Sequence, residues 1–394
     1  MNDKENPKLQ CSSRALSRRE FLRMASLAAA GALVSGCTRG TPSPEVPATI
    51  AVSTTAPVPD TSTAPETLAV APQSKQVAIA HADTYEPKVV YDRVRTLLDS
   101  LGGLGGVVSS GDKVAIKINM TGGVYWDGFA GVSGTETFIT HPEVVRALGQ
   151  LVRDAGAKEL YIVEAAYEWE SFVIWNYEQV AKDLGATLVD LNNVAPYSDF
   201  TTVAVPGGKL YQEFTFHRFL EEVDVFMSVS KMKCHATCGV THTMKNLVGL
   251  VPLQLYRAKN NDTYRSTLHG PTDETAHDRM PQIVTELNRA RPVHFGLVDG
   301  IKTTEGGEGP WVQTLAPIEP HVLVAGKNAV ATDAVATALM GFDPTAKKGT
   351  SPFQRCENHL NLAYDLGLGT NRLDEIEVLG ESIEALRQNF TACS

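Results

Sequence analysis

Residues 321–340 read H-V-L-V-A-G-K-N-A-V-A-T-D-A-V-A-T-A-L-M. Residues His321–Ala325 are apolar along most of their length, which is typical of a strand covered on both faces of a sheet. A longer stretch, Ala329–Met340, follows and is predicted to be a helix. A buried strand followed directly by a helix indicates an α/β fold.

The same alternation continues outward through residues 76–394. Strands are predicted at Gln76–Ala80, Lys113–Ile118, Leu160–Val163, Thr187–Asp190, Val223–Val229, Val293–Asp299, His321–Ala325 and Ile376–Leu379. Helices are predicted at Val89–Leu101, Pro142–Asp154, Ile174–Leu184, Met244–Val248, Asp278–Arg291 and Ala329–Met340. This order predicts an α/β domain whose mostly parallel sheet has helices on both faces. Small β excursions are expected at Ala195–Tyr211 and at the glycine-rich Gly122–Gly134.

The N-terminus has the pattern of an export signal. Ser17–Arg23 reads S-R-R-E-F-L-R and precedes an apolar run, Met24–Gly36, that is too short to span a membrane. A paired arginine before such a run is typical of the twin-arginine signal. The run ends in V-S-G-C at Cys37, which predicts lipid attachment to this cysteine. We therefore expect residues 1–37 to be read by the twin-arginine export machinery, with the mature chain anchored to a membrane by lipid on its periplasmic or extracellular face.

A tether is predicted between this signal and the domain. Residues 38–75 are rich in Thr, Pro and Ala and contain no aromatic residue, so they cannot bury enough surface to fold. Residues 76–394 remain as one α/β domain. The formal net charge is −10, and six basic and three acidic residues lie in the first 37, so the remainder is still more acidic. An acidic surface argues against nucleic acid as a partner.

The densest polar run follows the predicted strand Val223–Val229. Residues 230–246 read S-K-M-K-C-H-A-T-C-G-V-T-H-T-M-K-N and are predicted to form one loop and the start of a helix. Lys231 and Lys233 alternate, so on an extended segment they point to one side. Together with Lys245 and N–H groups at the helix start, they are expected to hold a carboxylate or phosphate.

Polar residues also lie at the other strand ends, where ligands bind in sheets of this kind. They are Lys117, Asn119, His141, Glu164, Asp299, Glu305 and Asp333. Each alone is more often a helix cap or a satisfied structural group. Their shared position near strand ends favours a common site.

Several motifs together resemble a known family. They are K-x-N at 117–119, T-H-P-E-V-V-R-A-L at 140–148, D-V-F-M-S-V-S-K-M-K-C-H at 224–235, M-K-N-L-V-G at 244–249, V-D-G-I at 298–301, E-G-G-E-G-P at 305–310, and the segment 325–344 that ends in G-F-D-P. From about Val77 to Gly380 the chain resembles the domain-of-unknown-function 362 family, which has no agreed activity.

The resemblance has implications for the fold and the site. It implies an α/β domain, and it implies that the family's recurrent polar positions are occupied by Lys117, Asn119, His141, Lys231, Lys233, His235, Lys245, Asn246, Asp299, Glu305 and Asp333. Some members carry a ferredoxin-like iron–sulfur module, but this chain has no C-x₂-C-x₂-C-x₃-C run. Cys234 stands where the family motif usually has threonine.

The cysteines allow a different hypothesis. Cys234 and Cys238 with Cys356 and His359 have ligand-like spacings, which would suit zinc, iron or an iron–sulfur cluster. Three alternatives compete: a Cys234–Cys238 disulfide, an ordinary buried Cys356, and a surface His359. A reactive Cys234 thiolate, activated by Lys233 and His235, is a further option.

Three functions therefore remain open. The first is an enzyme that acts on a small anionic substrate. Its candidate catalytic residues are His235, Lys233, Lys231, His141 and Lys245, and its candidate substrate-binding residues are Lys117, Asn119, Asn246, Asp299 and Glu305. The histidines would move protons, since histidine titrates near neutral pH. The second is a metal or redox protein that uses the cysteines. The third is a non-catalytic lipoprotein that binds a solute.

Overall fold

The computed structural model describes residues 73–257 and 266–393. The predicted signal, Cys37 and nearly all of the predicted tether lie outside the described residues. Within the described ranges, no helix combines the length and the apolar character needed to cross a bilayer.

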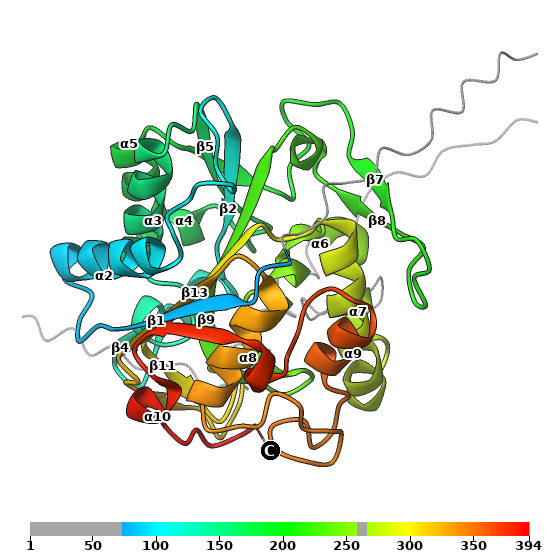
Figure 1. Ribbon diagram of the computed structural model, residues 1–394. Coiled ribbons are helices and arrows are strands. Elements are labelled where there is room, and N and C mark those ends of the chain that lie inside the picture. The colour runs from blue at the N-terminus through cyan, green and yellow to red at the C-terminus, as the bar shows by residue number, and fades with distance from the viewer. Residues whose placement is uncertain (1–72, 258–265, 394) are drawn as a thin grey trace, which may run out of the picture. The chain divides into compact units, whose positions relative to one another are not determined.

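One large sheet forms the centre of the described structure (Figure 1). Its main path runs in the order β14 (Glu377–Gly380), β1 (Gln76–His81), β13 (Val322–Gly326), β11 (Phe295–Glu305), β9 (Val225–His235), β2 (Lys113–Lys117), β5 (Glu159–Glu164) and β6 (Thr187–Asp190). Two short strands, β10 (Gly239–Thr241) and β12 (Ala316–Ile318), pair with β9 and β11 off this path. All eight predicted strands are therefore confirmed.

The strands of the main path are parallel, except for one. β11, β9, β2, β5 and β6 pair parallel in turn, as do β1 and β14, whereas β13 is antiparallel to both of its neighbours. β13 is fully buried. Its apolar sequence therefore indicates that both of its faces are covered, but it does not indicate whether the strand runs parallel or antiparallel to its neighbours. The mostly parallel sheet is confirmed.

Helices cover both faces of the sheet (Figure 1). They are α2 (Pro87–Ser100), α3 (Pro142–Asp154), α4 (Glu170–Ile174), α5 (Tyr177–Leu184), α6 (Leu253–Tyr256), α7 (Asp273–Ala290), α8 (Ala329–Leu339), α9 (His359–Asp365) and α10 (Ile383–Leu386). Helices α2, α3 and α5 pack into one apolar core, and α7 and α8 pack into two others. The predicted helix Ile174–Leu184 is interrupted, because Asn176 adopts the left-handed conformation (φ 64°) between α4 and α5.

Two small antiparallel hairpins stand apart from the main sheet. β3 (Gly128–Phe129) pairs with β4 (Val132–Ser133), and β7 (Thr201–Ala204) pairs with β8 (Glu213–Phe216). They lie in or beside the two segments where β excursions were predicted.

The polar run after residue 229 differs from the prediction. It was expected to be a loop, but β9 continues through His235 with all eleven residues buried. β10 pairs with it on one side and the extended β11 on the other, and together they satisfy its backbone. The predicted helix at Met244–Val248 is a short 3₁₀ segment, η4 (Lys245–Leu250).

Candidate functional site

The polar residues predicted at the strand ends meet where β2, β9 and β11 lie side by side. Lys117 of β2 is in register with Ser228 of β9, and Lys231 of β9 is in register with Asp299 of β11. Four lysines of this region are buried: Lys117, Lys231, Lys233 and Lys245. Their partners differ, and this difference separates the region into two parts.

Lys117 forms a buried ion pair in which all of its hydrogen-bond donors are used. Its Nζ lies 2.7 Å from Glu164 Oε1 and donates to the Ile118 carbonyl and to Asn246 Oδ1. These contacts use all three donors of an ammonium group. Burial raises the pKa of Glu164 and lowers that of Lys117, and the contact between them opposes both shifts. Asn119 Nδ2 donates to Asn246 Oδ1, while Asn119 Oδ1 is buried without a hydrogen-bond partner in the described structure.

Lys231 also has a full set of partners. Its Nζ donates to Asp299 Oδ2 (2.9 Å), Tyr85 Oη (2.8 Å) and the Thr135 carbonyl (2.8 Å). Tyr85 donates in turn to Asp299 Oδ1, and the His141 backbone N–H donates to Asp299 Oδ2. Lys231 and Asp299, predicted as catalytic and substrate-binding residues, therefore neutralise each other in a buried network.

Lys233 and Lys245 lack such partners. Lys233 Nζ donates to one acceptor, the Phe138 carbonyl at 2.7 Å. Lys245 Nζ makes no hydrogen bond or ion pair with any residue in the described ranges, although only 8% of the residue is exposed. Burial, opposed by the charge of Glu308 and reinforced by Lys245 and Lys231, lowers the pKa of Lys233 to about 7. Two cationic side chains are thus buried near each other without a carboxylate bound to either.

Two threonines flank Lys233 in the sheet. Thr241 of β10 and Thr304 of β11 are both in register with Lys233, so the three side chains project from the same face. Both hydroxyls are buried and, within the part of the chain that is described, have no hydrogen-bond partner. We name Lys233, Lys245, Thr241 and Thr304 the unpaired cluster.

The two threonines were not singled out in the sequence. Thr241 lies inside the polar run 230–246, and Thr304 directly precedes Glu305. Only strand register places them beside Lys233, and that register depends on an irregularity in β11 between Asp299 and Thr304.

The two predicted catalytic histidines are held neutral. Burial, reinforced by Lys245, lowers the pKa of His235 far below its usual value. Burial and the charges of Lys231 and Lys302 lower the pKa of His141 to about 2. Nδ1 of each ring accepts a backbone N–H, that of Thr237 for His235 and that of Glu143 for His141. The proton therefore resides on Nε2, so these rings are suited to donating a hydrogen bond and not to accepting a proton.

The start of η4 is occupied by a side chain of the chain itself. Asp333 Oδ1 accepts the Thr243 N–H and Oδ2 accepts the Met244 N–H, each at 2.9 Å. These two N–H groups, which directly precede Lys245, are therefore already used by Asp333, and the expectation that N–H groups at this helix start hold a substrate anion stays a prediction. Glu305 is also engaged elsewhere, since its Oε2 accepts the N–H of Thr391 near the C-terminus.

The cysteines do not assemble into a recognisable centre. Cys234, Cys238, Cys356 and Cys393 are free and buried. Within 73–257 and 266–393, no three His, Cys, Asp or Glu side chains are arranged to hold a metal ion. The metal and cluster hypotheses remain predictions.

The idea of a reactive Cys234 thiolate is contradicted. Cys234 projects to the face opposite Lys233, into an apolar core, where burial raises the pKa of its thiol. His359 is likewise buried, and not a surface residue. Its ring nitrogens have no hydrogen-bond partner that meets the usual geometry among the described residues.

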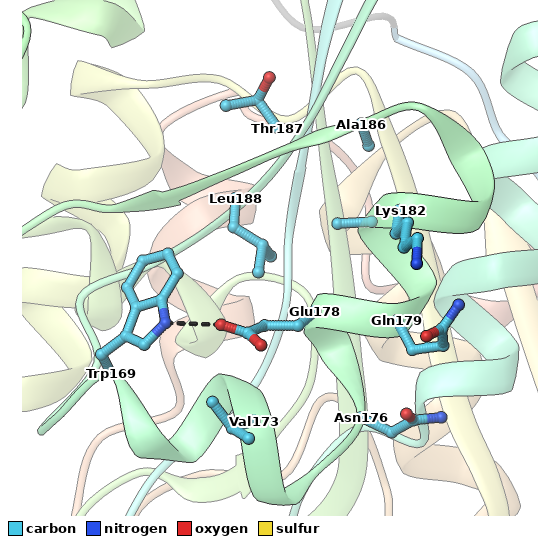
Figure 2. Close-up of a pocket in the computed structure, with 10 residues that line it drawn as sticks. Trp169, Val173, Asn176, Glu178, Gln179, Lys182, Ala186, Thr187 and Leu188 are labelled. Carbon is cyan, nitrogen blue, oxygen red and sulfur yellow. Dashed lines mark hydrogen bonds between the residues drawn. The ribbon is translucent and has the colours of Figure 1, made fainter.

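A separate groove lies at the edge strand β6 (Figure 2). Its lining includes Trp169, Val173 and Leu188, and Trp169 Nε1 donates to Glu178 Oε1 at 2.7 Å. None of the predicted site residues lines this groove. It provides a comparison for the unpaired cluster.

Comparison with known proteins identifies the family. The family model described as domain of unknown function (DUF362) matches residues 114–338, which is more than half of the 394 residues. The chain belongs to the DUF362 family. The match includes β2 from Val114 onward, all of β9 and β11, and the whole unpaired cluster.

The individual proteins that the chain matches say little about its chemistry. A thylakoid-associated protein of Synechocystis is 28% identical over 290 residues, which are 73% of this chain and 80% of that protein. A crystal structure of a protein from Thermotoga maritima superimposes with a TM-score of 0.32 at 12% identity, covering 60% of this chain and 55% of that one. The lactate racemase apoprotein of Thermoanaerobacterium thermosaccharolyticum gives 0.35 at 10% identity, with 63% and 54% covered. Both scores are too low to indicate a shared fold.

Proposed function

We propose that this DUF362 protein is an enzyme that binds a small organic acid at the unpaired cluster. One observation supports this most directly: Lys233 and Lys245 are buried with unused donors, and two partnerless hydroxyls flank Lys233. A buried cation with unused donors destabilises the folded state, and the charge of Glu308 offsets this only in part for Lys233. A carboxylate or phosphate bound there would add negative charge and accept from the free donors.

The cluster also suits catalysis. Because burial lowers the pKa of Lys233 to about 7, its uncharged amine is accessible near neutral pH, and this form is a proton acceptor or nucleophile. Lys245 would hold the acid group by charge. His235 Nε2–H, on the same face of β9 as Lys233, would donate a hydrogen bond to the substrate. The proton acceptor in this proposal is thus Lys233 and not a histidine.

The proposal includes a location. The paired arginine and the V-S-G-C sequence ending at Cys37 support export by the twin-arginine route and a lipid anchor. The thylakoid-associated relative supports association with a membrane in general. Mass spectrometry of the mature N-terminus, with a Cys37→Ser variant as control, tests this part.

Binding is tested by calorimetry on the full chain with acetate, lactate, pyruvate and inorganic phosphate. We expect at least one of them to bind, and Lys233→Met to weaken its binding about tenfold or more. Lys158→Met, which alters an exposed lysine, is the control and should leave binding unchanged. If none of these acids binds, or if Lys233→Met binds them as the wild type does, the proposal is wrong.

A further inference from the structure

A row of aromatic side chains leads from Lys233 to the surface. Lys233 Nζ lies 6.0 Å from the centre of the Phe138 ring, and the Phe138 ring centre lies 6.2 Å from that of Trp311. Trp126 is 6.2 Å from Trp311, and Tyr125 is 5.0 Å from Trp126. Phe138 is buried, whereas 41% of Trp311 and 83% of Tyr125 are exposed. The aromatic row therefore begins at the unpaired cluster and ends in solvent.

The ring of Trp311 packs closely against two glycine-containing segments of the backbone. A Cβ added at Gly309 would lie 2.3 Å from the Trp311 ring, and one at Gly122 would lie 2.9 Å from it. Gly122 also has a φ of +91°, which side-chain-bearing residues rarely adopt. The ring thus packs against two segments whose glycines leave room for it.

A carboxylate connects Trp311 to the cluster. Trp311 Nε1 donates to Glu308 Oε1 at 3.0 Å, and Glu308 Oε2 accepts the Ala236 N–H, next to His235, at 3.0 Å. The charge of Glu308 acts on Lys233. Trp311 is therefore positioned by the same carboxylate that influences the buried amine.

We propose that the acid bound by the unpaired cluster carries a flat aromatic ring, and that Trp311 and Tyr125 bind that ring. This inference rests on the function proposed above and specifies its substrate class as aryl acids. Ligand sites combine apolar aromatic walls with a few polar groups that fix orientation, and both are present here. Aromatic side chains favour flat rings by offset or edge-to-face packing. An aliphatic acid has no flat ring to pack against the exposed parts of Trp311 and Tyr125.

The test compares acids of equal charge and similar size. Benzoate and cyclohexanecarboxylate are titrated into the full chain by calorimetry, with acetate as the ring-free acid. Phenyl phosphate and inorganic phosphate distinguish an aryl phosphate from an aryl carboxylate. We expect benzoate or phenyl phosphate to bind about three- to tenfold more tightly than the matched acid without an aromatic ring, the range that aromatic contacts supply.

Trp169 offers a matched control for Trp311. It is exposed to a similar extent, 44% against 41%, and its Nε1 likewise donates to a glutamate, but it lies in the β6 groove (Figure 2). Trp311→Leu should abolish the preference for aromatic acids while retaining acetate binding, and Trp169→Leu should preserve the preference. If a variant fails to fold, the comparison of benzoate with cyclohexanecarboxylate on the wild-type protein still tests the aryl-acid inference.

The outcomes separate the two proposals. If acids bind in a Lys233-dependent way but aromatic rings add no affinity, the aryl-acid inference is wrong and the function stands. The same holds if Trp169→Leu abolishes the preference as much as Trp311→Leu does. If no acid binds, both proposals fail.

Discussion

Lys231 and Lys233 lie two residues apart on the same face of β9, and both are buried, yet their surroundings are opposite. Lys231 uses all three of its donors, one of them on Asp299, whereas Lys233 uses one donor on a carbonyl oxygen. The first arrangement holds β9 to β11 and to the segment before α3. The second ties β9 to the segment before α3 by one hydrogen bond, to the Phe138 carbonyl, and leaves the other donors of Lys233 unused among the described residues. Burial of a charged residue therefore does not by itself identify a site, and the proposed site rests instead on unused hydrogen-bonding capacity.

The largest effect on stability is expected from removing the Lys231–Asp299 ion pair. Lys231→Met leaves Asp299 as a buried carboxylate without its cation, so we expect the free energy of unfolding to fall by about 3–5 kcal/mol. Urea denaturation followed by circular dichroism measures it. A loss no greater than that of Lys233→Met would show that the two lysines are equivalent.

Lys233→Met should have the opposite effect. Removing a buried cation that has no carboxylate partner is expected to raise the free energy of unfolding by about 1–3 kcal/mol at pH 6, while acid binding is lost. Denaturation and calorimetry on the same sample test both parts. A destabilised variant that still binds acids would refute the assignment of Lys233 as a functional residue.

The stability difference between the wild type and Lys233→Met should depend on pH. The pKa of Lys233 is about 7 in the folded protein, and the ordinary value of a lysine is 10.5. Between these values the unfolded chain holds more protons, so the contribution of Lys233 to stability rises with pH. Its destabilising effect is greatest below pH 7. The stability advantage of Lys233→Met should therefore shrink as pH increases from 7 to 10. A constant advantage across this range would contradict a lowered pKa.

Replacing a threonine should produce a smaller effect. Thr304→Val removes a hydroxyl that has no partner in the described structure, so stability should change little while acid affinity falls about three- to tenfold. Thr303→Val is the matched control, because the Thr303 hydroxyl donates to the Met232 carbonyl. That variant should lose stability and retain acid binding. The reverse pattern would place the ligand elsewhere.

The smallest expected effect is a shift in the pH dependence of acid binding when Glu308 is replaced. Its charge raises the pKa of Lys233, so Glu308→Gln should move the pH at which acid binding weakens to a lower value. Wild-type affinity is expected to fall as pH rises above 7, because only the protonated Lys233 attracts the acid. Calorimetry at half-unit pH intervals measures the midpoint. An unchanged midpoint would mean that Lys233 does not titrate on binding.

Several features were predictable from the sequence because they depend on local pattern. The apolar runs identified the strands, and their alternation with amphipathic stretches identified the α/β class with helices on both faces. The family motifs located the two lysines and the histidine of β9. The direction of a strand was harder to predict from the sequence, since β13 is buried on both faces although it runs antiparallel to its neighbours.

The concentration of polar residues near the strand ends could be predicted from the amino-acid order, because residue type and spacing follow directly from it. Which of these residues are neutralised depends on the three-dimensional fold. Lys117 meets Glu164 across 47 positions of sequence, Lys231 meets Asp299 across 68, and the unpaired threonines reach Lys233 through the register of β10 and β11. Electrostatic pairing depends on distance in space, and four lysines that look alike in sequence therefore fall into two groups once the strands are side by side.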